Sequence, residues 1–366
     1  MTSEAEPPRR TGSILEGRAR ILLPIFLVAF VGISAYRLVW APTPPSGASF
    51  SGEVMGTRWS VHVADANLTP KARASLSRTI EEGLDRIDGL MSTFRDDSEL
   101  SRFNRADAHR PFSVAPETLE VFEIAREVSE LSGGAFDVTV GPLVAAWGFG
   151  ATDRIPAPPT DADLALARQR VGFARVEIGT GSLTKSRDDV ACDLSAIAKG
   201  YAVDRVAAAL QERGHRDFLV EVGGEVRANG RRLDGAVWRV AIERPDGNVR
   251  GIFDVIPLRD RALATSGDYR NYYEVDGRRF SHTIDPRSGR PIEHRLASVS
   301  VLHREAARAD ALATALDVLG PEAGYALAEV HGLAAYFIVR GADGVFTFRE
   351  TPAFRRAREP DTPAPR

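Results

Sequence analysis

The sequence lacks the features that mark several common classes of protein. Only one of its 366 residues is a cysteine, Cys192, which excludes an internal disulfide and a cysteine-rich metal site. The formal net charge is −3, and the central part of the chain has no basic run interleaved with aromatic residues, so we do not expect nucleic-acid binding. No Gly-x-Gly-x-x-Gly fingerprint and no Walker loop occurs, so the common nucleotide-binding folds are not indicated.

The residues that are present are those of a globular protein. With 43% hydrophobic and 27% charged residues, the chain can bury a sizeable core. Because cysteine is almost absent, a bound metal must use oxygen or imidazole ligands. Oxygen ligands would favour magnesium, calcium or manganese over zinc.

An apolar stretch near the N-terminus predicts a membrane anchor. Residues 21–35 are apolar, and with the following segment to Trp40 they are long enough to cross a bilayer if Arg37 reaches the interface. Four arginines precede the stretch, which places residues 1–40 as a cytoplasmic N-terminus and signal anchor in the inner membrane, with the remaining chain on the periplasmic side. Small residues near Ala35 and Ala41 also fit a cleaved signal peptide, which would export the chain as well.

The rest of the chain divides into a linker, one folded region and a tail. Residues 41–50 are rich in proline, glycine and serine and predict a linker, and residues 351–366 predict a loose tail. Between them, residues 51–350 mix helical and strand patterns without a regular alternation, which indicates an α+β fold with a mixed or antiparallel sheet. Helical spacing occurs over 76–91 and 197–210, and strand patterns occur over 59–63, 218–222, 237–242, 252–256, 298–302 and 335–339.

Lys199 stands early in a predicted helix that follows Asp193. A carboxylate at a helix start often caps the helix, so Asp193 has an ordinary structural interpretation. A cation at this end is disfavoured by the helix dipole unless an anion lies nearby. The pattern therefore suggests a bound phosphate, although the spacing alone also fits a simple cap.

Asp310 and Thr314 are four residues apart on a later predicted helix, so their oxygen atoms project from one face. A carboxylate and a hydroxyl at this spacing suit a hard cation that keeps other positions for phosphate oxygens. An aspartate near a helix start with a threonine one turn later is also a common structural pattern. Both interpretations stay open on the spacing alone.

His282 is the best candidate for a general base among the seven histidines. A single histidine in a strand is often structural. His282, however, precedes two turn signals, Asp285-Pro286 and Ser288-Gly289, so it is expected at a strand end, where loops carry function.

Seven segments, taken together and in order, resemble the ApbE family of FAD:protein FMN transferases. They cover most of residues 54–320, and their joint occurrence is specific although each is short. The segments are VMGTRWSV, MSTFRDDSELSRFN, GGAFDVTVGPLVAAWGFG, DLSAIAKGYAVDRV, LVEVGGEVRANG, ATSGDYRNYYEVDGRRFSHTIDPRSGRP and ADALATALDVLG. The resemblance implies a T-fold-like α+β architecture with mixed and antiparallel sheets packed with helices.

The resemblance also implies roles for individual residues. Asp310, Thr314 and the backbone carbonyl of Ala196 would hold magnesium, and His282 would deprotonate the incoming hydroxyl. The positions that would hold FAD are Met55, Phe94, Ala135, Phe136, Asp137, Asp193, Lys199 and Ile284. Three positions depart from the family pattern. Phe94 stands where the family often has tyrosine, and Glu225 stands where it usually has aspartate. Ala313 adds no polar atom to the helix that would hold the metal.

The expected activity is the magnesium-dependent transfer of FMN from FAD to a threonine or serine hydroxyl of an acceptor protein, with release of AMP. One alternative is an FAD pyrophosphatase, in which water replaces the protein hydroxyl. Another is a non-catalytic flavin-binding protein. The expected partners are FAD, the acceptor protein and, through the N-terminal segment, the membrane; the sequence does not name the acceptor.

Overall fold

The computed structural model describes residues 47–150, 157–246, 251–267 and 272–358. The predicted anchor, residues 1–40, and the first part of the predicted linker lie outside the described residues. Within the described ranges, no helix is both long and apolar enough to cross a bilayer. The predicted linker boundary at residue 50 is wrong, because a strand begins at Ala48 and Phe50 is already buried in the core.

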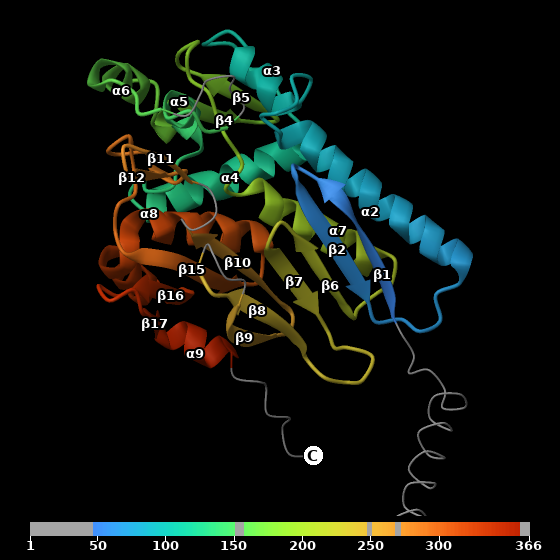
Figure 1. Ribbon diagram of the computed structural model, residues 1–366. Helices are drawn as coiled ribbons and strands as arrows, with labels where there is room; N and C mark the ends of the chain where they lie inside the picture. The colour runs from blue at the N-terminus through green and yellow to red at the C-terminus, as the bar shows by residue number, and fades with distance from the viewer. Residues whose placement is uncertain (1–46, 151–156, 247–250, 268–271, 359–366) are drawn as a thin grey trace, which may run out of the picture. The chain divides into compact units, whose positions relative to one another are not determined.

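An antiparallel sheet of eight strands forms the centre of the fold (Figure 1). The described strand pairs are all antiparallel, so the α+β prediction is confirmed in its antiparallel form. All six predicted strands overlap observed ones. In order across the sheet, the strands are β1 (Ala48–Val54), β2 (Thr57–Val63), β6 (Phe218–Val222), β7 (Glu225–Asn229), β10 (Arg261–Gly267), β15 (Leu296–His303), β16 (Ala334–Arg340) and β17 (Phe346–Glu350).

Helices cover one face of this sheet. They are α2 (Pro70–Met91), α7 (Ala198–Glu212) and α8 (Ala306–Val330), and α4 (Pro116–Leu131) packs against α2 and α8. The predicted apolar stripe of α2 is buried from Leu76 to Met91, as expected for a helix with one face on a core. Side chains of β15 such as Val299 and Val301 point into the same core.

A second layer covers the opposite face of the sheet. It consists of the hairpin β8 (Trp238–Glu243) and β9 (Ile252–Leu258) together with α9 (Pro352–Arg358). The prediction of a loose tail from residue 351 is therefore wrong for residues 351–358. Phe354 is fully buried with its ring 5.3 Å from that of Tyr336, and the hydroxyl of Thr351 accepts from the amide of Ala335. This burial orders a segment whose composition suggests a solvated end.

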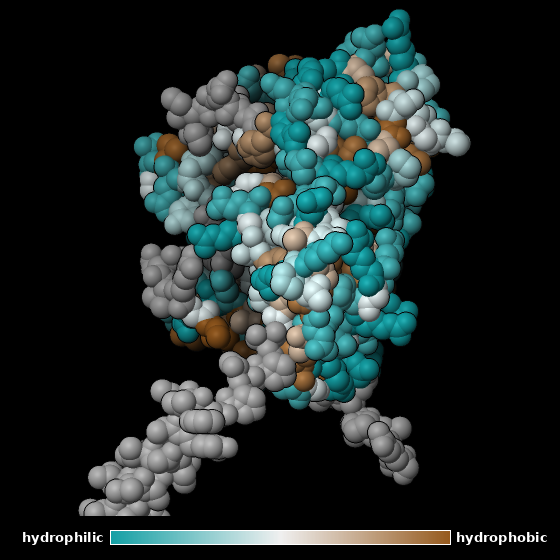
Figure 2. Space-filling view, turned by 90° about the vertical axis from the view of Figure 1, so that its right-hand side faces the viewer, coloured by the Kyte–Doolittle hydropathy of each residue, from teal (hydrophilic) through white to brown (hydrophobic). Residues whose placement is uncertain are grey.

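The edge strand β1 is polar on its outer side. Ser49, Ser51 and Glu53 are exposed and alternate with the buried Ala48 and Phe50. Figure 2 views the molecule from the side of β1 and α2 and shows a mainly hydrophilic surface with apolar residues in small separate groups. Polar edge residues discourage pairing with another chain, so we do not infer a docking surface on this side.

The remaining elements form a smaller assembly beside the helical layer (Figure 1). A third cluster of buried residues there includes Leu143, Trp147, Phe280 and Ile284, and the indole of Trp147 donates to the carbonyl of Gly289 at 2.8 Å. The elements are α3 (Glu99–Arg105), β3 (Phe112–Ser113), η1 (Val138–Val140), α5 (Gly141–Ala146), α6 (Asp161–Arg168), η2 (Phe173–Arg175), β4 (Val176–Gly179), β5 (Ser182–Lys185), β11 (Tyr272–Val275), β12 (Arg278–Ser281), β13 (Ile284–Asp285) and β14 (Arg290–Pro291).

Helices α7 and α8 come very close together at Gly200. A Cβ atom at this position would lie 2.4 Å from the carbonyl oxygen of Ala306 and 2.8 Å from the Cβ of Asp310. We expect Gly200→Ala to lower the free energy of unfolding by about 2 kcal/mol or more, because the two helices must move apart. Urea unfolding measures this change.

The matched control is Gly83→Ala in α2, where a Cβ would meet no atom within 4 Å. This change should raise stability by about 0.5–1 kcal/mol, the usual gain of alanine over glycine in a helix. If both variants were stabilised alike, the close approach of α7 and α8 at Gly200 would be incorrect.

Candidate active site

Lys199 lies in the first turn of α7 and faces two buried carboxylates. Its Nζ is 3.5 Å from Oε1 of Glu225, the first residue of β7, and 3.8 Å from Oδ2 of Asp310 on α8. It also donates to the carbonyl of Ser195 at 3.0 Å. The side chains of Glu225 and Asp310 are buried. The predicted cation early in this helix is present, and its counter-ions come from two other elements.

The start of α7 leaves a backbone carbonyl available at Ala196. In a regular helix the amide of Gly200 would donate to the carbonyl four residues earlier. Here that amide donates to Oδ2 of Asp310 at 3.0 Å. Among the residues that the structure describes, no backbone amide donates to the Ala196 carbonyl. This oxygen atom can therefore serve as a ligand.

The charges of this cluster do not balance. Burial raises the pKa of Glu225, and nearby Asp310 raises it further, although Lys199 opposes the shift. Burial likewise raises the pKa of Asp310 against the effect of Lys199. For Lys199 burial alone would lower the pKa, but Asp310 and Glu225 outweigh it and the pKa is raised. When both carboxyl groups are ionised they outnumber the single ammonium group, so the cluster either retains a proton on a carboxyl group or accepts a further cation.

The raised pKa of Glu225 predicts how stability depends on pH. The folded-state pKa lies above the ordinary value of 4.5, so the folded state holds the proton more tightly than the unfolded state. The stability that this proton contributes is complete below pH 4.5 and is lost as the pH rises through the raised folded-state pKa. We expect Glu225→Gln, measured in EDTA, to be more stable than the native chain at pH 8 and to lose less stability between pH 5 and pH 8.

Thermal unfolding across this pH range measures the effect. Glu329→Gln is the control, because Glu329 is exposed on α8 and its side chain has no ion pair or hydrogen bond among the described residues. An equal pH profile for Glu225→Gln and Glu329→Gln would show that Glu225 is an ordinary ionised glutamate in the folded state.

Asp310 and Thr314 lie on one face of α8, as predicted. The hydroxyl of Thr314 is 3.1 Å from that of Ser266 in β10, and the only hydrogen bond to the Asp310 carboxylate among described residues goes to Oδ2. The described residues contain no group of three or more His, Cys, Asp or Glu side chains arranged to hold a metal. A cation here would use the oxygens of Asp310, Thr314 and the Ala196 carbonyl, a set that suits magnesium and not zinc.

Two tight turns border Lys199. Met55 and Gly56 have φ values of +52° and +68° and connect β1 to β2 in a two-residue turn, in which methionine is an unusual choice. Gly223, with φ +65°, lies in the turn from β6 to β7. A Cβ on Gly223 would be 2.9 Å from Cγ2 of Thr57 and 3.1 Å from Cδ of Lys199. The predicted FAD residues Met55 and Lys199 thus lie on neighbouring segments, beside an open recess lined by Glu53, Val54, Gly56, Thr57 and Arg58.

His282 directly follows β12, at the strand end where it was predicted. The ring is half-buried, and its centroid lies 6.4 Å from that of Phe149 in an edge contact. The next residue, Thr283, donates to Oδ2 of Asp317 at 3.4 Å. Asp317 is three residues beyond Thr314, so α8 carries the oxygen pair and also anchors the segment of His282.

The segment Ala135, Phe136 and Asp137 is buried, so its side chains contribute to the interior. The Asp137 carboxylate accepts from the amide of Thr139 at 2.8 Å, from its hydroxyl at 2.6 Å and from the amide of Phe173 at 2.8 Å. Burial raises the pKa of this carboxyl group. The described contacts give Asp137 a folding role, and a contact of this segment with FAD stays a prediction.

The other three predicted FAD positions lie in different settings. Asp193 does not cap α7, which begins at Ala198; its Oδ1 accepts from the amide of Ser195 at 2.8 Å and orders the preceding turn. Ile284 is buried in the third cluster. Phe94, between α2 and α3, is 73% exposed and is available for stacking. The described contacts do not join these residues into one binding surface.

Sequence reasoning missed several residues of the Lys199 cluster. Glu225 was noted only as a departure from the family pattern, yet it is the nearer counter-ion of Lys199. Ser266 and Thr57 lie in segments that resemble the family but carry no individual signal. The glycine pair at 223–224 belongs to another of these segments, and only the fold shows that Lys199 packs against it.

Comparisons with known proteins identify relatives of this chain. The model of the ApbE family matches residues 55–337. The chain is 43% identical over 311 residues to the FAD:protein FMN transferase of Vibrio cholerae serotype O1, covering 85% of this chain and 93% of that protein. It is 39% identical over 317 residues to the protein of the same name from Haemophilus influenzae, covering 85% and 91%.

Solved structures show the same fold. The structure titled flavin transferase ApbE from Vibrio cholerae superimposes with a TM-score of 0.79 at 41% identity, covering 86% of this chain and 99% of that one. The ApbE protein of Thermotoga maritima has a TM-score of 0.76 at 27% identity, covering 86% and 100%.

Proposed function

This chain belongs to the ApbE family, and on that premise we propose how its own residues carry out the transfer of FMN from FAD to an acceptor protein. The observation that carries the proposal is the meeting of Lys199, Glu225 and Asp310 beside the two glycine turns. These groups come from α7, β7 and α8, and they join a cation to an oxygen-only ligand set. Such a pairing suits the diphosphate of a dinucleotide.

Lys199 binds the diphosphate of FAD in this proposal. The Lys199 side chain is 26% exposed, so it can reach a ligand while the carboxyl groups of Glu225 and Asp310 hold it in place. Its position in the first turn of α7 adds the positive end of the helix dipole. Glu225 therefore acts as a positioning residue for Lys199.

Asp310, Thr314 and the Ala196 carbonyl would hold magnesium. When bound, the ion would withdraw electrons from the diphosphate and make the phosphorus more electrophilic. The fit rests on the donor chemistry: one carboxylate, one hydroxyl and one carbonyl that no described backbone amide occupies.

His282 accepts the proton of the acceptor hydroxyl. The hydroxyl oxygen of a threonine or serine attacks the phosphorus on the FMN side and forms a new phosphoester bond. The bond between that phosphorus and the bridging oxygen breaks, and AMP leaves with the electron pair. The half-buried position of His282 at the end of β12 leaves its ring accessible to a side chain of a folded partner.

The test uses the purified full-length chain with FAD, magnesium and a protein extract as the source of acceptors. In-gel flavin fluorescence that survives denaturation, with AMP released in equal amount, supports transfer. Mass spectrometry then identifies the modified residue. Release of FMN and AMP without a labelled protein would favour the pyrophosphatase, and FAD binding without any release would favour a flavin carrier.

We also propose that residues 1–40 anchor the chain in the inner membrane, with the catalytic domain on the periplasmic side. The support is the apolar run that follows four arginines. In untreated cells the catalytic domain should be found in the membrane fraction. Protease added to spheroplasts should digest it. Protection of the domain until the membrane is lysed would reverse the assignment.

A further inference from the structure

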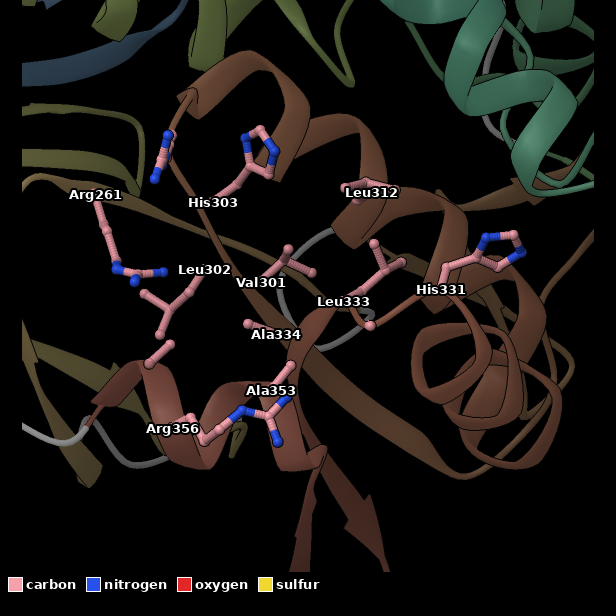
Figure 3. A pocket seen from close by; sticks show the side chains of 13 residues that line it. Arg261, Val301, Leu302, His303, Leu312, His331, Leu333, Ala334, Ala353 and Arg356 are labelled. Atoms are coloured by element: carbon pink, nitrogen blue, oxygen red, sulfur yellow. The ribbon is translucent and has the colours of Figure 1, made fainter.

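A basic recess lies at the far end of the sheet from the Thr314 contact. It has a volume of about 500 Å³, within the usual range for small-molecule sites, and its walls come from β10, β15, β16, α8 and α9 (Figure 3). Arg261 begins β10, whereas Ser266, the partner of Thr314, lies five residues further along that strand. Five strand residues span roughly 16 Å. Leu312 of α8 lines the recess, but no residue of the Lys199 cluster does, so the two sites are distinct.

Cationic side chains surround the recess. Arg261, Arg304 and Arg356 line it, and no aspartate or glutamate does so among the described lining residues. In the described part of the chain, none of the three guanidinium groups has an ion pair or a side-chain hydrogen bond. By contrast, the next arginine along α9, Arg358, pairs with both Asp254 and Glu350.

Three unpaired guanidinium groups around one recess repel each other unless an anion lies between them. Figure 3 shows Arg261 and Arg356 coming from separate elements, with Leu302 and Ala334 between them. Guanidinium groups suit carboxylates and phosphates because they donate two parallel hydrogen bonds.

His303 adds a neutral imidazole to the same recess. Its Nδ1 lies 3.0 Å from the amide nitrogen of Glu305, from which it can accept, and 3.2 Å from the carbonyl oxygen of Glu305, to which the other tautomer can donate. Burial lowers the pKa of His303, which keeps the ring neutral near pH 7. The recess therefore contains a neutral imidazole in addition to the guanidinium groups.

The floor of the recess is apolar. Val301, Leu302, Leu333 and Ala334 line it together with the cationic groups. An inorganic anion would leave these side chains uncovered, whereas a ligand with a hydrocarbon part would bury them.

We propose that this recess is a binding site for an organic anion that joins a phosphate or carboxylate group to a small apolar body. The anionic group would lie among Arg261, Arg304 and Arg356, and the apolar body on Leu302 and Leu333. The same chemistry is available from a free metabolite or from an anionic lipid headgroup.

The experiment titrates the full-length chain with butyl phosphate by calorimetry, with butanol and inorganic phosphate in parallel. Butyl phosphate should bind more tightly than either, because it alone satisfies both the arginines and the apolar floor. In the double variant Arg304→Gln/Arg356→Gln, the dissociation constant for butyl phosphate should rise at least roughly tenfold, as expected for the loss of charge-assisted hydrogen bonds. Both residues are exposed, so the variant is expected to fold, and its thermal unfolding is measured alongside.

The matched control is Arg78→Gln/Arg126→Gln. These arginines are also exposed and without ion pairs in the described structure, but they lie on α2 and α4. The control should bind butyl phosphate like the native chain. Equal weakening in both double variants would reveal a general charge effect and overturn the proposal, as would the absence of butyl phosphate binding at millimolar concentration.

Vesicles separate the two sources of the ligand. If phosphatidylglycerol vesicles bind the native chain more strongly than the Arg304/Arg356 variant, and neutral vesicles show no such difference, the ligand is a lipid headgroup. If butyl phosphate binds and the vesicles show no difference, the ligand is a free organic anion. These titrations contain no FAD, so their outcome does not depend on the proposed mechanism.

Discussion

Replacing Asp310 with asparagine is expected to reduce magnesium-dependent FMN transfer roughly 10³-fold, the scale of several kcal/mol of transition-state stabilisation. The remaining amide oxygen can still accept from the Gly200 amide and lie near Lys199, as Oδ2 of Asp310 does. The NH₂ group of asparagine replaces the other carboxylate oxygen, Oδ1, and it cannot bind a cation. The fold should therefore persist while the metal ligand is lost.

Initial rates over a range of magnesium concentrations measure this effect. Asp96→Asn is the control, because Asp96 is fully exposed and its only ion pair among the described residues is a 4.0 Å contact with Arg105. The control should leave both the rate and its magnesium dependence unchanged. An Asp310→Asn chain with the native rate at low magnesium would refute the metal assignment.

Replacing His282 with glutamine is expected to slow transfer by about 10² to 10⁴-fold, the usual contribution of a general base. FAD binding should change much less, because the proposed diphosphate contacts are made by Lys199 and by the magnesium that the α8 oxygens would hold. Comparing kcat with the dissociation constant for FAD separates the two effects. A variant that lost FAD binding and kept its rate at saturating FAD would show that His282 only positions the substrate.

His62→Gln is the control for this experiment. His62 is exposed on β2, where its ring is 2.9 Å from the hydroxyl of Ser49, and it lies outside the proposed machinery. Its replacement should leave the rate of transfer unchanged. Loss of activity in both histidine variants would point to destabilisation of the fold, which thermal unfolding detects.

Local patterns predicted the elements that have strong periodicity. The stripe from Leu76 to Met91 is a helix with that face buried, and the run Phe218–Val222 is a strand with the same bounds. Strand β10 was missed because its residues are small: Ala262 and Ala264 have little strand preference. The fold selects them because α8 packs closely on this strand.

The tail is a second segment whose structure local composition did not predict. Residues 351–366 are rich in charge and proline, which predicted a loose segment. Phe354 becomes ordered only because Tyr336 and Ile338 leave an apolar surface on the far face of the sheet. Single residues of this kind order a segment through tertiary contacts that local composition does not reveal.

Some residues of the candidate site were predicted from the sequence, and others were found only in the structure. Type and position along the chain made four residues candidates, and the family resemblance implied their roles: Lys199, Asp310, Thr314 and His282. Glu225 was noted only as a departure from the family pattern, because its importance depends on burial beside Lys199. The Asp137 carboxylate was expected to hold FAD, whereas the described structure satisfies it with three hydrogen bonds from its own surroundings.

The sequence by itself determined the class of fold, the family and the chemical groups available for the reaction, because these depend on residue types and their order. Only the tertiary structure decided which groups share an environment: that Glu225 and Asp310 both reach Lys199, that the Gly200 amide leaves the Ala196 carbonyl available, and that three arginines distant in sequence surround one recess. Burial and mutual distance set the charge state of such groups, and both arise when distant segments pack together.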